Sequence, residues 1–230
     1  GFLAVPVTII WIVGITNAVN LIDGLDGLAV GVSSIAAITM LAVALLTDNM
    51  AIAITMAALT GACIGFMPYN LNPAKIFMGD TGSTFLGYML ATVSIMGLFK
   101  FYAVISFAVP FLILGLPIFD TANAIIRRLA EGRSPMSPDR GHVHHKLIDM
   151  GFNQKQAVAI LYAISATLGL TAVVLTSSGE VKAVVLLAAV LAAILVGACI
   201  IYGAEHWGKH PQEQKKHKNE AAQEEKNKHE

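Results

Sequence analysis

The stretch NLIDGLDGLAVGVSSIAAITMLAVALLTDNM, residues 20–50, indicates the fold class of this 230-residue chain. Two aspartates, Asp23 and Asp26, stand directly before an uncharged, largely apolar run at 28–47. A helix needs about 20 such residues to cross the hydrocarbon core of a bilayer. Hydrophobic residues make up 56% of the chain and charged residues only 13%, against about 25% in soluble domains. The composition is that of an all-α, polytopic membrane protein.

Seven apolar stretches are expected to form transmembrane helices, at 2–16, 28–47, 51–67, 84–99, 101–119, 157–176 and 181–202. If the chain crosses the membrane at each of them, the long polar loops at 17–27, 68–83 and 127–156 all fall on one face. We expect residues 1–203 to form one transmembrane catalytic domain. The charged segment 204–230 mixes signs and lacks apolar periodicity, so we expect it to be a disordered tail.

The distribution of Lys and Arg predicts which face is cytoplasmic. Before the tail, the face with the long loops carries Lys75, Arg127, Arg128, Arg133, Arg140, Lys146 and Lys155, and the other face carries Lys100 and Lys182. Because cytoplasmic loops carry the excess of positive charge, we expect the long loops and the tail to be cytoplasmic. Net charge is zero, and no nucleic-acid partner is expected. The two cysteines, Cys63 and Cys199, lie in apolar runs and imply no disulfide framework.

The first long loop carries a polar side chain at every third position: Asn17, Asn20, Asp23 and Asp26. On a helix these four would form one slowly drifting stripe. An interfacial turn would explain a single Asp-Gly pair. Four regularly spaced amides and carboxylates at the end of a span favour a functional site, because ionisable residues at membrane depth are functional candidates.

The second long loop places GDTGS, residues 79–83, directly before an apolar helix. Asp80 or Thr81 could simply cap that helix. The same geometry would let free backbone amides bind phosphate while Asp80 holds Mg²⁺. Phe77, in the same loop, could stack on a flat ring or pack into the core.

The third long loop contains SPDRGHVHHKL, residues 137–147, with three histidines beside two basic residues: His142, His144, His145, Arg140 and Lys146. Three interpretations stay open. A zinc site is weakly indicated, because no cysteine accompanies the histidines. A solvated basic loop is the simplest interpretation. A diphosphate pocket is the third, since Arg and His donate hydrogen bonds to phosphate oxygens.

Four stretches taken together resemble one protein family: NAVNLIDGLDGLAVG at 17–31, PYNLNPAKIFMGDTGSTFLGY at 68–88, GLPIFDTANAIIRR at 115–128 and SPDRGHVHHKL at 137–147. In this order they resemble the polyprenyl-phosphate N-acetylhexosamine-1-phosphate transferases, integral membrane enzymes that start cell-wall and surface polymers on a lipid carrier. The resemblance covers residues 1 to about 202. The HVHHKL form is similar to the branch that uses UDP-N-acetylglucosamine, as in teichoic-acid linkage, O-antigen or enterobacterial common antigen synthesis.

One feature of that family is not found in these residues. Family members carry an adjacent Asp-Asp pair in an earlier cytoplasmic loop, and the 230 residues contain no such pair. The chain begins after the place where the pair would lie. We therefore expect it to be the C-terminal part of the family fold, with little transferase activity by itself.

The resemblance implies transfer of N-acetylglucosamine-1-phosphate from UDP-N-acetylglucosamine to undecaprenyl phosphate, with release of UMP, in the bacterial plasma membrane. It implies Mg²⁺ as cofactor, with Mn²⁺ as a substitute, and it is compatible with a homodimer. Asp80 would be the metal ligand. The expected catalytic residues are Asp23, Asp26, Asp80 and His144. The expected substrate-binding residues are Asn17, Asn20, Asn70, Phe77, Arg140, His142 and His145, of which Asn70 and Phe77 would hold the uracil.

Other functions stay open on the sequence alone. A phospho-N-acetylmuramoyl-pentapeptide transferase would use the same loops. An ion-coupled transporter would use the same acids as an ion pathway, and Asp120 favours it most, although the acids lie at span ends. An inactive remnant is the third alternative. The transferase hypothesis requires Asp23, Asp80 and His144 to meet on one face, beside a groove that opens sideways toward the bilayer.

Overall fold

The computed structural model describes residues 2–98, 103–135, 137 and 141–177, and these are helical apart from their connections. The eight helices of these residues are α1 (Ala4–Leu21), α2 (Leu28–Leu46), α3 (Met50–Asn70), α4 (Gly79–Leu98), α5 (Ala103–Ile113), α6 (Gly115–Ala130), α7 (Val143–Asp149) and α8 (Gln154–Ser177). The expected span at 181–202 and the expected tail at 204–230 lie outside the described residues.

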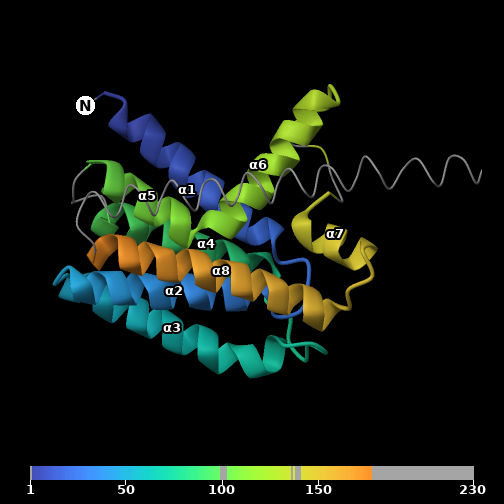
Figure 1. The fold of residues 1–230 in the computed structure, drawn as a ribbon, viewed down its shortest axis with the longest axis horizontal. Helices are drawn as coiled ribbons and strands as arrows, with labels where there is room; N and C mark the ends of the chain where they lie inside the picture. The colour runs from blue at the N-terminus through green and yellow to red at the C-terminus, as the bar shows by residue number, and fades with distance from the viewer. Residues whose placement is uncertain (1, 99–102, 136, 138–140, 178–230) are drawn as a thin grey trace, which may run out of the picture. The chain divides into compact units, whose positions relative to one another are not determined.

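Helix α2 is the centre of the bundle. It packs against α3, α4 and α8, and Figure 1 shows α2, α3 and α8 running side by side. The close approach depends on small residues, as is usual between helices in lipid. Gly31 of α2 lies against the ring of Tyr162, and Gly169 of α8 lies against Thr39. The buried hydroxyl of Ser34 is satisfied within the helix, because its Oγ donates to the Val30 carbonyl oxygen at 2.7 Å.

A second packed pair joins α1 to α4. Gly87 of α4 approaches the backbone of Thr16 so closely that a Cβ would lie 2.7 Å from the Thr16 Cα atom. Nearer the N-terminus of α1, Trp11 Nε1 donates a hydrogen bond to Ser94 Oγ at 2.9 Å. The Trp11 ring also meets the Phe111 ring edge-on, with centroids 4.9 Å apart. Because α1 and α4 pack antiparallel, the C-terminal end of α1 lies beside the N-terminal end of α4.

Four of the described helices are long and apolar enough to cross a membrane: Ala4–Leu21, Leu28–Leu46, Met50–Asn70 and Gln154–Ser177. The expected total of seven spans is therefore not confirmed. Helix α4 includes the polar first turn of the second loop and does not meet the same criterion. The multi-pass, all-α architecture itself agrees with the sequence prediction.

The stretch at 101–119, expected to form a single helical span, is divided between two helices in the described residues. The helix ends at Ile113, and α6 begins at Gly115 after Leu114, which has φ −99° and ψ 17°. Two prolines, Pro110 and Pro117, flank the break and each removes a backbone donor from the helical pattern. Helix α6 then runs at a steep angle to α8, as Figure 1 shows, and contacts α1. Its buried side chains recur every fourth residue, at Leu116, Asp120, Ala124 and Arg128.

Candidate functional site

The first and second loops meet at one end of the bundle. Asn20, in the last turn of α1, donates through Nδ2 to Asp80 Oδ1 at 3.1 Å and to Ser83 Oγ at 2.8 Å. Ser83 is fully buried, and its hydroxyl donates in turn to the carbonyl oxygen of Gly79 at 3.0 Å. The carboxylate of Asp80 is itself exposed. One amide therefore fixes the position of an acid that comes 60 residues later in the chain.

The carboxylates of Asp23 and Asp80 lie near enough to interact electrostatically, and we call them the carboxylate pair. Partial burial, and second the negative charge of Asp80, raise the pKa of Asp23 to about 6. Two like charges in one site disfavour each other's ionised form, so the pair is a place where a cation or a proton is stabilised. Mg²⁺ takes oxygen ligands and is commonly held by one or two carboxylates together with substrate phosphates and water. The donor set of Asp23, Asp80 and the Asn20 amide fits such an ion.

Asp26 and Asn70 hold the loops against each other. Asp26 Oδ2 accepts hydrogen bonds from Asn72 Nδ2 at 3.1 Å and from the Ala74 amide at 3.0 Å. Asn70 is 2% exposed, and its Oδ1 accepts from the Gly27 amide at 3.2 Å while its Nδ2 donates to the Ile76 carbonyl at 3.0 Å. Both side chains therefore hold the loops together through hydrogen bonds within the protein, and their expected roles toward a substrate stay predictions.

Gly27 lies where the first loop meets α2 and contacts both the second loop and α8. It has φ +81° and forms the N-cap of α2. A Cβ there would lie 2.9 Å from the side chain of Leu71. Its carbonyl accepts a 2.5 Å hydrogen bond from the Tyr162 hydroxyl of α8. Only glycine combines the left-handed backbone with this close approach.

The third loop reaches the first through His144. A Cβ on Gly24 would lie 2.5 Å from Nε2 and 3.0 Å from Cε1 of His144. The ring is 2% exposed, and within the described residues neither of its nitrogens has a hydrogen-bond partner. Burial first, and then the charge of His145, lower the pKa of His144 to about 4. The ring is therefore neutral at physiological pH, and its one donor and one acceptor have no partner among the described residues.

Asp120 anchors this histidine segment to α6. Its Oδ2 lies 2.9 Å from His142 Nδ1, and its Oδ1 accepts from the Val143 amide at 2.8 Å. Asp120 and His142 are both buried, at 2% and 5% exposure. The ring of His142 stacks on that of His144, with centroids 5.7 Å apart. The transferase hypothesis assigned Asp120 no site role, and the signal in the sequence was one acid on the buried stripe of an amphipathic helix.

The remaining expected site residues are His145, Phe77, Asn17 and Arg140. The ring of His145 is tilted against His144 with centroids 4.2 Å apart. Phe77 is 76% exposed, as a ring that stacks on a ligand would be, and Asn17 is exposed on α1. Arg140 lies outside the described residues. A search of those residues finds no group of three or more His, Cys, Asp or Glu side chains arranged to hold a metal ion, so the zinc interpretation gains no support.

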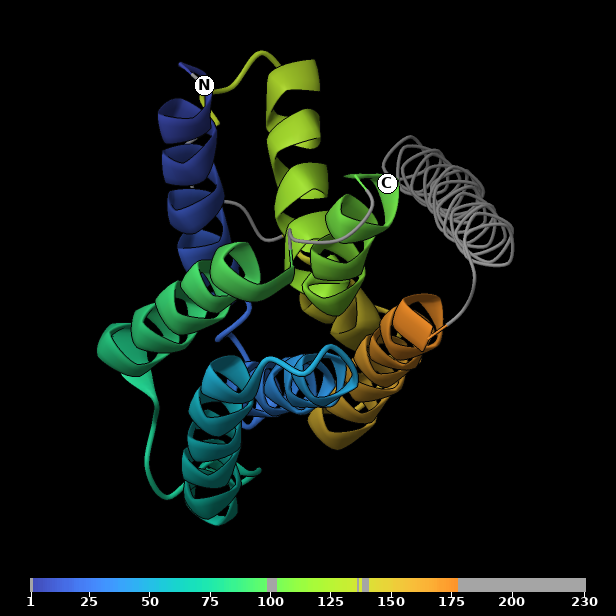
Figure 2. The same cartoon turned by 90° about the vertical axis from the view of Figure 1, so that its left-hand side faces the viewer.

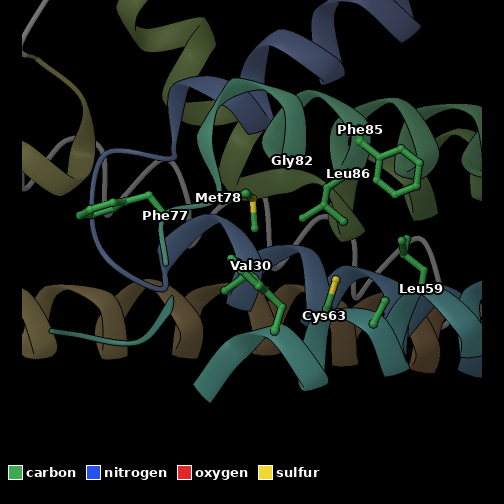
Figure 3. Close-up of a pocket in the computed structure, with 10 residues that line it drawn as sticks. Val30, Leu59, Cys63, Phe77, Met78, Gly82, Phe85 and Leu86 are labelled. Atoms are coloured by element: carbon green, nitrogen blue, oxygen red, sulfur yellow. The ribbon is translucent and has the colours of Figure 1, made fainter. Parts of the chain in front are cut away.

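An apolar groove lies beside the first turn of α4. It has a volume of about 240 Å³ and runs between α3 and α4, over α2. In Figure 3, Val30 forms its floor, Leu59 and Cys63 reach it from α3, and Leu86 reaches it from α4. Met78 and Gly82, which line one end, flank Asp80 in the sequence. An apolar groove is thus present at this end of the bundle, and the expected opening toward the bilayer stays a prediction.

The chain belongs to glycosyl transferase family 4, whose family model matches residues 1–98. It is 46% identical over 178 residues to a protein of Bacillus subtilis (strain 168) named "Probable undecaprenyl-phosphate N-acetylglucosaminyl 1-phosphate transferase", covering 77% of this chain and 50% of the relative. It is 39% identical over 181 residues to the "Decaprenyl-phosphate N-acetylglucosaminephosphotransferase" of Mycolicibacterium smegmatis, covering 69% of this chain and 44% of the relative.

A third relative represents another substrate. The chain is 35% identical over 173 residues to the "Phospho-N-acetylmuramoyl-pentapeptide-transferase" of Clostridium beijerinckii, covering 73% of this chain and 50% of the relative. The chain spans about half the length of the curated relatives it matches.

Proposed function

We propose that the protein containing this chain transfers N-acetylglucosamine-1-phosphate from UDP-N-acetylglucosamine to undecaprenyl phosphate and releases UMP. The main support is the hydrogen bond from Asn20 to Asp80, which joins two loops into one polar site at the end of apolar helices. The similarity to a named undecaprenyl-phosphate N-acetylglucosaminyl 1-phosphate transferase adds to it. The surplus of Lys and Arg on the loop face favours a cytoplasmic site in a bacterial plasma membrane.

The reaction joins two anions, so positioning and charge neutralisation are the main requirements. An oxygen of the lipid phosphate attacks the phosphorus that bears the sugar, and the bond from that phosphorus to the bridging oxygen of UMP breaks. A phosphate monoester has its second pKa near 6, so the nucleophile needs no strong base at neutral pH. A bound Mg²⁺ would neutralise charge on the phosphate oxygens, and Asp80 with Asp23 would hold it.

The remaining side chains have supporting roles in this proposal. Neutral His144 supplies one donor and one acceptor beside Gly24, where it can bind a phosphate or sugar oxygen. Phe77 offers an exposed ring for the uracil. We assign positioning roles to Asn70 and Asp26, because their polar atoms hold the loops in place. Asp120 positions His142 in the same way.

The test is UMP release by the full-length protein in membranes or nanodiscs, with Mg²⁺ and undecaprenyl phosphate. We expect turnover with UDP-N-acetylglucosamine and at least tenfold slower turnover with UDP-N-acetylmuramoyl-pentapeptide. Preference for the second donor would reassign the protein to the pentapeptide-transferase branch. No release of UMP with either donor would refute the proposal.

A further inference from the structure

One side-chain amide connects all three polar loops. Asn72 of the second loop donates through Nδ2 to Asp26 Oδ2 of the first loop at 3.1 Å, and the same nitrogen donates to Gln154 Oε1 at 2.7 Å. Gln154 is the first residue of α8, at the end of the third loop, and lies 82 residues further along the chain. A side-chain amide nitrogen carries two hydrogens. Both are used here, one for each neighbouring loop.

The connection lies at the N-terminal end of α2. Helix α3, which leads into the second loop, and helix α8, which follows the third, lie on opposite sides of α2 (Figure 2). The bond from Asn72 to Gln154 therefore crosses the end of α2, where Asp26 precedes the N-cap Gly27. The separation between the second and third loops thus depends on this bond as well as on the packing of each helix on α2.

The histidine segment is tied to the start of α8. Helix α7, which carries His144, packs on α8, and only residues 150–153 connect the two helices. This connection is held by backbone hydrogen bonds, among them one of 3.2 Å from the Phe152 amide back to α7. Asn153 and Gln156 exchange hydrogen bonds between side chain and backbone, in the manner of a capping box. A contact that fixes the first turn of α8 therefore also fixes the position of His144.

We propose that Gln154 is a positioning residue for the sugar-nucleotide donor. Through Asn72 it holds the second loop and the histidine segment at a fixed separation. The inference rests on the proposed function, in which the donor has its uracil at Phe77, its diphosphate at Asp80 and a phosphate or sugar oxygen at His144. The donor is the substrate that must contact both loops at once. A change in their separation should therefore weaken binding of the donor first.

The attachment of α8 has other support, so a change at Gln154 should leave the protein folded. Tyr162 joins α8 to the Gly27 carbonyl by a second hydrogen bond, and α8 packs along α2 and α5. Asp120 holds the other end of the histidine segment through His142. Loss of the Gln154 bond should thus alter the spacing of the loops within an intact bundle.

The first experiment compares Gln154→Met with Gln156→Met in the full-length protein in nanodiscs. The two changes are chemically identical and lie in the same turn, but the bonds of Gln156 are to Asn153 beside it. We expect Gln154→Met to raise the KM for UDP-N-acetylglucosamine about fivefold, as expected for one hydrogen bond between neutral groups. The KM for undecaprenyl phosphate should stay the same, and Gln156→Met should change neither. An unchanged donor KM in Gln154→Met, or an equal rise in both KM values, would overturn the assignment.

The second experiment asks whether Gln154 acts through Asn72. Asn72→Ala removes the same hydrogen bond from the other side, so adding Gln154→Met to it should raise the donor KM no further. If the two effects multiply instead, the residues act separately and the proposal is wrong.

The third experiment needs no turnover. The NMR signals of the His144 ring should shift in Gln154→Met and stay in place in Gln156→Met. Unshifted signals in Gln154→Met would show that the start of α8 does not position His144. A wild-type protein that releases no UMP would instead refute the proposed function, and the ring signals would still decide whether Gln154 positions the histidine segment.

Discussion

Asn20 and Asp80 are joined by a 3.1 Å hydrogen bond, although 60 residues separate them. The bond connects the last turn of α1 to the first turn of α4, and these helices are packed along their length through contacts such as Gly87 on Thr16. The position of the Asp80 carboxylate is therefore set by helix packing as well as by its own loop. Four predictions follow from this arrangement and from the contacts around it.

Asp80→Asn should lower Mg²⁺-dependent UMP release by the full-length protein by about 10²–10³-fold, the range seen when one electrostatic group of an active site is removed. The amide keeps the shape and still accepts the Asn20 hydrogen bond, so the thermal unfolding midpoint should stay within about 2 °C. Removal of Mg²⁺ with a chelator should have the same effect on the wild type. Wild-type turnover by the variant would show that Asp80 does not hold the metal.

Gly24→Ala should displace His144, because the added Cβ would lie 2.5 Å from the ring nitrogen. We expect turnover to fall at least tenfold and the NMR signals of the His144 ring to shift. Gly14→Ala is the matched control, since no atom lies within 4 Å of its added Cβ. Gly14 lies inside a helix, where alanine costs nothing relative to glycine. Equal activity of the two variants would mean that the contact between Gly24 and His144 is unimportant.

Asp120→Ala should release the histidine segment from α6. It removes the acceptor of the Val143 amide and the partner of His142, both in buried surroundings. Each hydrogen bond to a charged group contributes about 1.5–3 kcal/mol, so we expect faster proteolysis between residues 131 and 142 and a loss of turnover. Asp149→Ala, at an exposed position on the same segment, serves as the control. Unchanged proteolysis in Asp120→Ala would contradict the anchoring role.

The protonation of His144 should destabilise the protein in acid. Its pKa is about 4 in the folded state and near 6.5 in an unfolded chain. Between these values the unfolded state binds more protons, so stability falls as pH drops from about 6.5 to 4. His145, His142 and Asp120 face the ring and act on the same equilibrium.

The measurement is the free energy of unfolding at pH 7 and pH 5 for the wild type and for His144→Phe. The variant should lose less stability between the two pH values, because its ring cannot bind a proton. A histidine NMR titration should show the His144 ring still neutral at pH 5. An ordinary titration near pH 6.5 would contradict the burial of this ring.

Much of this chain could be predicted from local sequence. The run at 28–47 predicts a span because its length and apolarity are properties of the residues themselves, and α2 occupies Leu28–Leu46. The order of the polar loops predicts the family, and the chain belongs to it. The break at Leu114 was missed, since the apolar run 101–119 continues through it and only the two prolines signal it. Composition determines which segments enter a membrane, but not where a helix bends within one.

Only the tertiary structure decided which polar residues hold the loops together. Asn70 and Asp26 have the same residue types as Asn20 and Asp23, yet their atoms bond to backbone groups of Gly27 and Ala74. The sequence cannot separate these roles, because a hydrogen-bond partner depends on how distant helices pack. The groove is likewise a product of packing, since it exists because α3 and α4 both pack on α2 and not on each other.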